Sequence, residues 1–262
     1  MLRFFSKMRY KLAAENRVGK YLRYAIGEIL LVVIGILIAL QINNWNQHRK
    51  DNASELEILK GLQNEFNSNL NAINNSINKD RQISHSCFNI IELIRSGNIE
   101  EQSEKLDSLL QFVASFGSFD AATGVTDEII NSGKLHILKN DSLRIRLTQW
   151  SGRLTDSKED LNYRFENYHH NLMPFFTQNF PLVNGDLTKE ITNQITGELL
   201  PNIEEPSPFK TNFEELNLME FESVIWLHKH NNDYVLYTDT GLKKEIQTIL
   251  ELIKSDISKK KQ

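Results

Sequence analysis

Hydrophobic positions near the N-terminus form one unbroken run. Residues Ile29–Leu40 include no polar side chain. A helix over Leu22–Asn43 would rise about 33 Å at 1.5 Å per residue, enough to cross a hydrocarbon core of roughly 30 Å. We therefore expect one transmembrane helix over residues 21–45.

Beyond this run the apolar residues recur at three- and four-residue spacing, which is typical of amphipathic helices. Gly97 offers the first helix stop after the run, so a single helix is expected to continue from the membrane into the following domain. Asn140 or Asp141 is expected to cap a later helix, and Asn217 with Glu220 forms a capping box. The apolar stripes lie at Leu56–Ile94, Leu143–Leu172 and Phe221–Ile253.

The pattern predicts an all-α fold, in which the transmembrane helix continues into an antiparallel helical bundle over residues 46–262. A further helix is expected over Ser103–Phe116, followed by a short one capped by Thr126 and ended by Gly133. All five prolines lie between Pro174 and Pro208. Residues 174–212 are therefore expected to form an irregular crossover, with at most a short helix over Leu187–Leu199.

Charge predicts the orientation of the span. Residues 1–23 carry seven Lys and Arg against Glu15 alone. The positive-inside rule places this end, with its basic segment 1–20, in the cytoplasm, and the domain 46–262 in the periplasm. A cleaved signal peptide is the alternative, but no small-residue cleavage site follows the apolar run. We expect a single-pass protein of the inner membrane.

Two sequence blocks carry a resemblance to a known family. Residues 24–46 read YAIGEILLVVIGILIALQINNWN, and residues 132–147 read SGKLHILKNDSLRIRL. Both resemble an uncharacterised family of N-terminally anchored, single-span membrane proteins from Bacteroidetes-type bacteria. The resemblance implies an inner-membrane protein with a periplasmic domain, and it implies no activity. Where that family often has an acidic residue after the Trp-Asn pair, this chain has Gln47.

Glu28 is the sharpest candidate residue, because a carboxyl group within hydrocarbon needs a partner or a function. Glu28, Gly35 and Ala39 share one side of the predicted helix. Gly35 and Ala39 form a small-residue step that lets another helix approach closely, and a protonated Glu28 could bond across that contact. Alternatively, Glu28 lies close to the interface or bonds Tyr24.

The last predicted helix has polar residues on its apolar face. His228, Asn232 and Asp239 interrupt the apolar stripe there. Buried polar groups need partners, so these residues could form a polar layer that fixes register or lines a small ligand pocket. Alternatively, this face simply leaves the bundle at that point.

The remaining chemistry points away from catalysis. None of the common catalytic, nucleotide-binding or zinc-protease motifs is present, so we expect no enzyme and no cofactor. The seven histidines include no pair at i,i+4 spacing in the clusters His169–His170 and His228–His230, so we predict no metal site.

The charge balance limits the partners. Removing the seven N-terminal bases, with Glu15 and Glu28, leaves 23 Lys and Arg against 32 Asp and Glu, which disfavours nucleic acid. The expected partners are the lipid bilayer and either a second copy or another membrane protein. The sequence therefore favours an interaction or scaffold module of the cell envelope. The alternative is a receptor-like module that binds a ligand and acts through a membrane partner.

Overall fold

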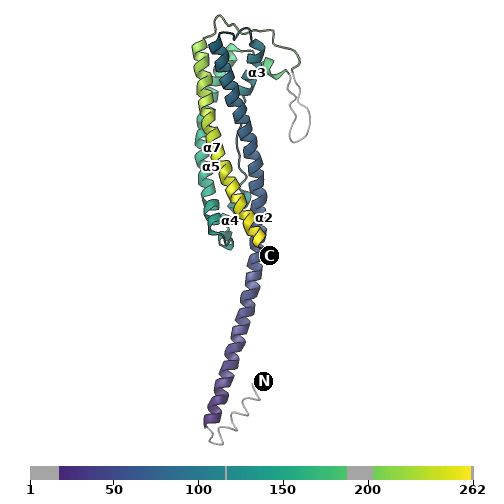
Figure 1. Cartoon of the computed structure of the whole chain (residues 1–262), viewed down its shortest axis with the longest axis vertical. Coiled ribbons are helices and arrows are strands. Elements are labelled where there is room, and N and C mark those ends of the chain that lie inside the picture. The colour runs from purple at the N-terminus through teal and green to yellow at the C-terminus, as the bar shows by residue number, and fades with distance from the viewer. Residues whose placement is uncertain (1–17, 116, 188–202, 261–262) are drawn as a thin grey trace. The chain divides into compact units, whose positions relative to one another are not determined.

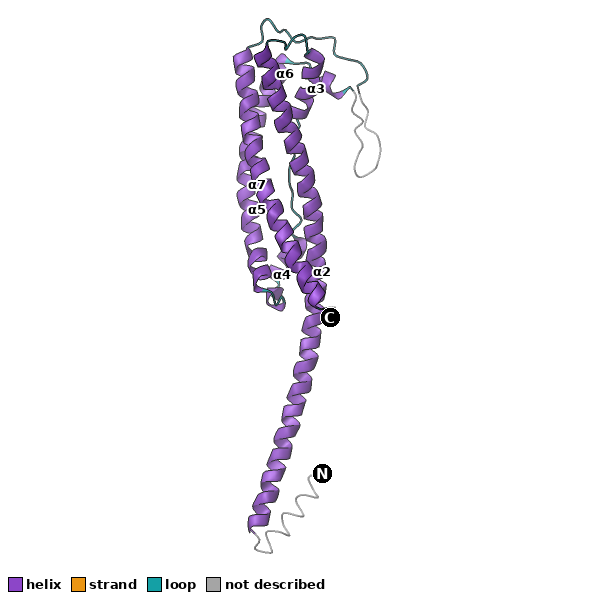
Figure 2. Ribbon diagram, in the orientation of Figure 1, coloured by secondary structure: helices purple, strands orange, loops and turns teal. Residues whose placement is uncertain are grey.

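A computed structural model describes residues 18–115, 117–187 and 203–260. These residues form helices and loops, without a strand among them (Figure 2). The all-α prediction is confirmed at this level. The chain divides into two compact units, Met1–Glu57 and Ile58–Gln262, called here the N-terminal and C-terminal units.

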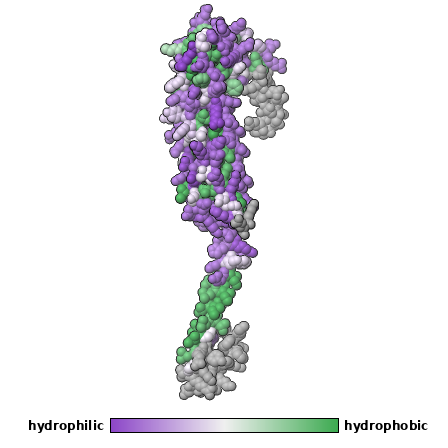
Figure 3. Space-filling model, viewed as in Figure 1, coloured by the Kyte–Doolittle hydropathy of each residue, from purple (hydrophilic) through white to green (hydrophobic). Residues whose placement is uncertain are grey.

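The first described helix, α2 (Val18–Ser96), includes residues of both units, as expected from the lack of a breaker before Gly97. Gly97 follows it with a φ of 73°, a left-handed conformation that glycine adopts without steric cost. The apolar residues of its N-terminal part are exposed, and they form the hydrophobic band of Figure 3. The expected basic segment lies mostly outside the described residues.

Long helices build the C-terminal unit. The second part of α2 lies beside α5 (Asp141–Asn167) and α7 (Leu218–Lys259) (Figure 1). Side-chain bonds between α2 and α7 join Ser76 to Asp239 and Arg95 to Glu222, so residue numbers rise along one helix as they fall along the other. The shorter elements are α3 (Ser103–Val113), α4 (Gly124–Asn131), η1 (Lys134–Ile137), η2 (Tyr168–Leu172), α6 (Met173–Asn179) and η3 (Leu182–Asp186).

Side-chain caps begin the two long C-terminal helices where the sequence predicts them. The Asn140 side chain accepts a bond from the Leu143 amide at the start of α5. The Asn217 side chain accepts one from the Glu220 amide at the start of α7. Each cap satisfies an amide that has no partner within its helix.

Residues 117–123 form an extended segment that lies along α2 (Figure 2). Asn69 clamps it, donating to the Ala122 carbonyl and accepting from the Ala122 amide, each at 2.8 Å. The Glu65 carboxylate accepts from the amides of Val125 and Thr126 and from the Thr126 hydroxyl. The cap predicted at Thr126 is therefore wrong. Thr123 precedes α4, Thr126 is the third residue of that helix, and Glu65 accepts from its first amides.

The predicted start of the crossover at Pro174 is wrong. The π-helical turn η2 leads directly into α6, and Pro174 lies in the first turn of α6. A proline fits there because the first amides of a helix lack partners within it. Irregular structure begins after Asn179, and the short helix expected over 187–199 lies almost wholly outside the described residues.

Two hydrophobic clusters form the core of the C-terminal unit. One includes Phe66, Trp150 and Ile246, and the other includes Cys87, Phe176 and Phe221. Along each long helix, polar buried residues lie between the two clusters. These polar residues are the candidate site.

Candidate functional site: a buried polar layer

Three helices contribute side chains to this layer. The second part of α2 contributes residues spaced four apart, which places them on one face of the helix. α5 contributes one arginine, and α7 contributes residues on the face that packs toward α2. The members of the polar layer are Ser76, Asp80, Ser84, Arg164, His228, Asn232 and Asp239.

Arg164 is the centre of the layer and is only 1% exposed. Its Nη1 donates to Asp80 Oδ1 at 2.8 Å and to Asn232 Oδ1 at 3.0 Å. Its Nη2 donates to the carbonyl of Gly117 in the extended segment. One guanidinium thus joins α2, α7 and the extended segment to α5.

Asn232 extends the network along α2. Its Nδ2 donates to the Asp80 carbonyl and to Ser84 Oγ, each at 2.8 Å, and the Ser84 hydroxyl donates to Asp233. Ser76 donates to Asp239 Oδ2 at 3.0 Å one helical turn away. These bonds fix α7 against α2 at a single register, because each acceptor meets its donor at one alignment only.

Burial sets the charge states of the layer. Burial raises the pKa of Asp80, and the Arg164 guanidinium opposes that rise without cancelling it. Burial raises the pKa of Asp239 to about 6, against the bond from Ser76 and with a smaller contribution from the charge of Asp80. Burial lowers the pKa of His228 to about 4, and the charge of Arg164 adds to this effect. His228 is therefore neutral at pH 7.

Some buried polar atoms of the layer have no hydrogen-bond partner. They include Asp80 Oδ2, Arg164 Nε and both ring nitrogens of His228. The Val113 backbone weakly favours protonation of His228, but neither ring nitrogen has the geometry of a hydrogen bond. The His228 ring packs instead against Tyr168, with ring centroids 6.2 Å apart. A buried polar atom without a partner costs free energy, so these atoms oppose the stability that the bonds of the layer supply.

The structure brings together the three predicted polar residues of α7. His228 and Asn232 are 0% exposed and Asp239 is 4% exposed. Their face therefore stays inside the C-terminal unit, which leaves the exposed-face interpretation without support. The side chains of Asn232 and Asp239 form hydrogen bonds with α2, and Asn232 also accepts one from Arg164. None of the three residues lines the surface pocket that is described next.

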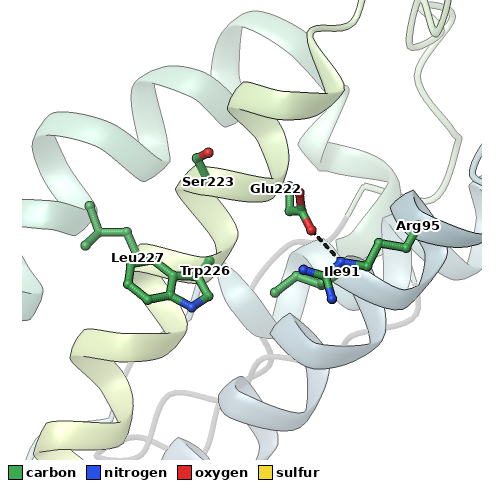
Figure 4. Close-up of a pocket in the computed structure, with 6 residues that line it drawn as sticks. All are labelled: Ile91, Arg95, Glu222, Ser223, Trp226 and Leu227. Atoms are coloured by element: carbon green, nitrogen blue, oxygen red, sulfur yellow. Dashed lines mark hydrogen bonds and ion pairs between the residues drawn. The ribbon is translucent and has the colours of Figure 1, made fainter.

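A surface pocket of about 450 Å³ lies between α2 and α7 (Figure 4). An ion pair crosses its rim, where Arg95 Nε donates to Glu222 Oε1 at 2.6 Å. Ile91, Ser223, Trp226 and Leu227 complete the lining. The pocket thus combines an indole and aliphatic side chains with a compensated pair of charges.

The predicted interaction face of the N-terminal unit is described for three residues. Gly35 and Ala39 are exposed, and Glu28 is half-buried. A Cβ added at Gly35 would meet nothing within 4 Å, so space for a second helix is open there. Glu28 has an interaction within the chain, and the side chain of Tyr24 lies outside the described residues.

Metal and thiol chemistry have little support in the described part of the chain. Within it, no group of three or more His, Cys, Asp and Glu residues could hold a metal ion. Cys87 is fully buried, and burial raises the pKa of its thiol to about 12. His170 pairs with Glu166, and the His230 ring stacks on Trp226.

Sequence reasoning missed Asp80 and Arg164. Both lie within amphipathic stripes, and the signal that could have found them is a charged residue at an apolar position of each stripe. Arg164 falls three residues after Leu161 and one before Phe165. Two charges of opposite sign at core positions of separate helices predict a buried pair, because a single buried charge is costly.

Comparison with known proteins identifies the family of the chain. None of the curated proteins and none of the solved structures is significantly similar to it. Residues 28–178 match a family of unknown function, DUF6090. The matched region includes Glu28, Asp80 and Arg164 and ends before α7. Since the match covers more than half of the chain, the protein belongs to this family of unknown function.

Proposed function

We propose that the protein is a membrane-anchored interaction module of the cell envelope. In this proposal the apolar part of α2 spans the inner membrane once, the basic N-terminus lies in the cytoplasm, and the C-terminal unit is an antiparallel helical bundle in the periplasm. Its task is to hold a second copy or another membrane protein, without catalysis of its own.

The exposed apolar stretch of α2 carries this proposal. The most apolar 18-residue window in this helix has a mean hydropathy of 2.6, and none of it is buried within the chain. So large an exposed apolar surface needs lipid or protein around it. A core helix would instead be covered by the rest of the chain. A signal sequence remains the alternative, since it shares this composition and position.

The face Glu28, Gly35 and Ala39 is the proposed contact between helices in the membrane. The exposed Gly35 and Ala39 allow the backbone of another helix to approach closely. Glu28 adds a carboxyl group on the same side, where a hydrogen bond would be favoured by the apolar surroundings. The buried polar layer supports the same role, because it keeps the C-terminal unit in one register.

Crosslinking in membranes tests this role. The native chain and the variants Glu28→Leu and Gly35→Leu are expressed at equal levels, crosslinked in isolated membranes and analysed for assemblies. We expect a loss of most of the crosslinked species in both variants. Gly27→Leu is the matched control, because Gly27 lies about 100° from Glu28 on the helix and also has open space around it. Unchanged assemblies in both test variants would refute the proposal.

The receptor-like alternative keeps one observation in its favour. The pocket of Figure 4 offers a place for a ligand on the surface of the C-terminal unit. The polar layer offers no such place, because its side chains bond to one another and to the backbone across the helices. A ligand-dependent role therefore depends on what the pocket binds.

A further inference from the structure

A row of aromatic side chains follows the exposed face of α7 from the pocket onward. Trp226, His230, Tyr234 and Tyr237 are spaced four, four and three residues apart, so they lie within an arc of about 80° on the helix. The exposed fractions of the Trp and Tyr residues are 53%, 54% and 80%. An exposed helix face normally carries charged residues, so this aromatic row is unusual.

Contacts within the row hold three of its rings, those of Trp226, His230 and Tyr234, in place. The Trp226 and His230 rings stack, with centroids 5.0 Å apart and planes inclined by 12°. The Tyr234 ring meets His230 edge-on at 4.9 Å. Trp226 also lines the pocket, together with Ile91 and the Arg95–Glu222 pair (Figure 4). The row therefore presents a preformed aromatic surface that ends in a pocket.

The charges beside the row are compensated. Arg95 pairs with Glu222 at 2.6 Å, and Lys229 pairs with Asp233 at 2.6 Å. These two pairs carry no excess of positive charge for phosphate groups, and their carboxylates already have cationic partners. An ionic ligand would have to break these pairs, whereas an uncharged polar ligand could bond to their remaining donors and acceptors.

The polar tips of the row disfavour an apolar partner. Tyr hydroxyls and the imidazole of His230 interrupt the apolar area that a membrane or a hydrophobic helix would need. Flat aromatic faces beside paired Arg and Glu side chains suit a saccharide, whose C–H faces stack on rings and whose hydroxyls both donate and accept. From Trp226 to Tyr237 the helix rises about 16 Å. This distance exceeds the length of a single sugar ring and matches that of a short oligosaccharide.

We propose that the aromatic row and the adjoining pocket bind a linear, uncharged oligosaccharide. Trp226 stacks on one sugar ring at the pocket, Arg95 and Glu222 bond to its hydroxyls, and Tyr237 contacts a ring farther along. The site lies wholly in the C-terminal unit, so it holds whether or not the transmembrane helix associates with a partner.

Calorimetric titration of the full chain in detergent micelles tests the proposal. The probes are tetrasaccharides of N-acetylglucosamine, glucose in β linkage, and glucose in α linkage, with tetragalacturonate as the charged comparison. We expect at least one neutral probe to bind, and to bind more tightly than the charged one. Trp226→Ala should weaken binding at least tenfold and Tyr237→Ala several-fold.

Tyr163→Ala is the matched control, because Tyr163 is 72% exposed on α5 and lies outside the row. Its binding should equal that of the native chain. Trp226→Phe keeps a ring at the pocket and should restore part of the affinity lost in Trp226→Ala. Three outcomes would overturn the proposal: no neutral probe binds at millimolar concentration, the charged probe binds best, or Trp226→Ala binds as the native chain does.

Discussion

Arg164 shows at the scale of single residues how the polar layer controls the fold. Its guanidinium bonds to Asp80, Asn232 and Gly117, and its side chain is almost fully buried. Replacing it with Met would remove the charge that compensates Asp80. Breaking a buried pair in this way costs about 3–5 kcal/mol, whereas replacing both partners with apolar residues is often neutral.

We therefore predict that Arg164→Met lowers the free energy of unfolding by at least about 3 kcal/mol. Denaturant unfolding followed by circular dichroism measures the change. The double variant Arg164→Met/Asp80→Leu should regain most of the loss, which a double-mutant cycle resolves as coupling. If the losses of the two single variants simply add in the double variant, the pair is not coupled and this account of the layer fails.

Asp239 makes stability depend on pH. Its pKa is about 6 in the fold and 3.8 as an ordinary carboxyl. Because the folded value is raised, the contribution of Asp239 is fully present below pH 3.8 and is lost as the pH rises through 6. Asp239→Asn keeps an acceptor for Ser76 and carries no charge. We predict that this variant is up to about 3 kcal/mol more stable than the native chain at pH 7.5, and equally stable near pH 3.5.

His228 acts in the opposite direction. Its pKa is lowered from 6.5 to about 4, so its contribution is present above pH 6.5 and is lost as the pH falls through 4. His228→Leu also removes two buried nitrogens without partners. We predict that His228→Leu gains stability over the native chain as the pH falls from 6.5 to 4, measured as a difference in thermal midpoint. A constant difference across this range would show that His228 is not held neutral.

Prediction from sequence found the members of the layer on α7 and missed those on α2 and α5, so neither partner of the Arg164–Asp80 pair was predicted. Asn232 and Asp239 were found because each interrupts an apolar stripe within its own helix. Their partners on α2 and α5 depend on which helices meet and at what height, and periodicity within one helix does not contain that information. Arg164 was also hidden because a long side chain beside Leu161 and Phe165 can be expected to reach solvent.

At the scale of elements, the extended segment 117–123 packs along α2 without forming a helix. From Asn69 to Asp80 the helix rises about 16 Å, and the five steps from Gly117 to Ala122 span about 17 Å when extended. The anchors at Asn69 and Arg164 therefore match the reach of the segment. Its start lies close to α2, because a Cβ at Gly117 would be 3.1 Å from Asp80 Oδ1 and 3.3 Å from the Ser76 carbonyl.

Two glycine substitutions separate close packing from helix propensity. We predict that Gly117→Ala lowers the free energy of unfolding by about 1–3 kcal/mol, because the added methyl group displaces Asp80 from Arg164. Gly152→Ala lies in the middle of α5 with nothing within 4 Å, so it should raise stability by about 0.5–1 kcal/mol. Denaturant unfolding measures both. A stabilising Gly117→Ala would mean that the segment is not packed against α2 as described.

Local signals explain which elements the sequence predicts well. Asn140 and Asn217 bond within their own first turns, so their caps depend on residues three positions away and were predicted correctly. The start of the crossover at Pro174 was predicted wrongly, because the preceding π-turn allows a new helix to begin there. The cap predicted at Thr126 was wrong, because the group that satisfies these amides is Glu65, sixty-one residues away in the sequence.

At the scale of the whole molecule, membrane topology is the property on which the proposed role depends. The native thiol makes it measurable, because Cys87 is fully buried with a pKa of about 12 and should not react with maleimide. A cysteine introduced at an exposed position then reports its own compartment. Ser151 is exposed on α5, and Ser6 lies in the basic N-terminal segment.

We predict that a membrane-impermeant maleimide labels Ser151→Cys in cells whose outer membrane has been permeabilised. Ser6→Cys should be labelled only after the inner membrane is dissolved, because the proposed topology, based on the excess of Lys and Arg before the apolar run, puts that end in the cytoplasm. The native chain is the control and should stay unlabelled in both conditions. Labelling of Ser6→Cys while the inner membrane is intact would show that the N-terminus lies outside the cytoplasm, opposite to the proposed topology. A mature protein that is shorter by the apolar run, recovered from the soluble fraction, would instead identify the run as a cleaved signal sequence and remove the basis for a contact at Gly35.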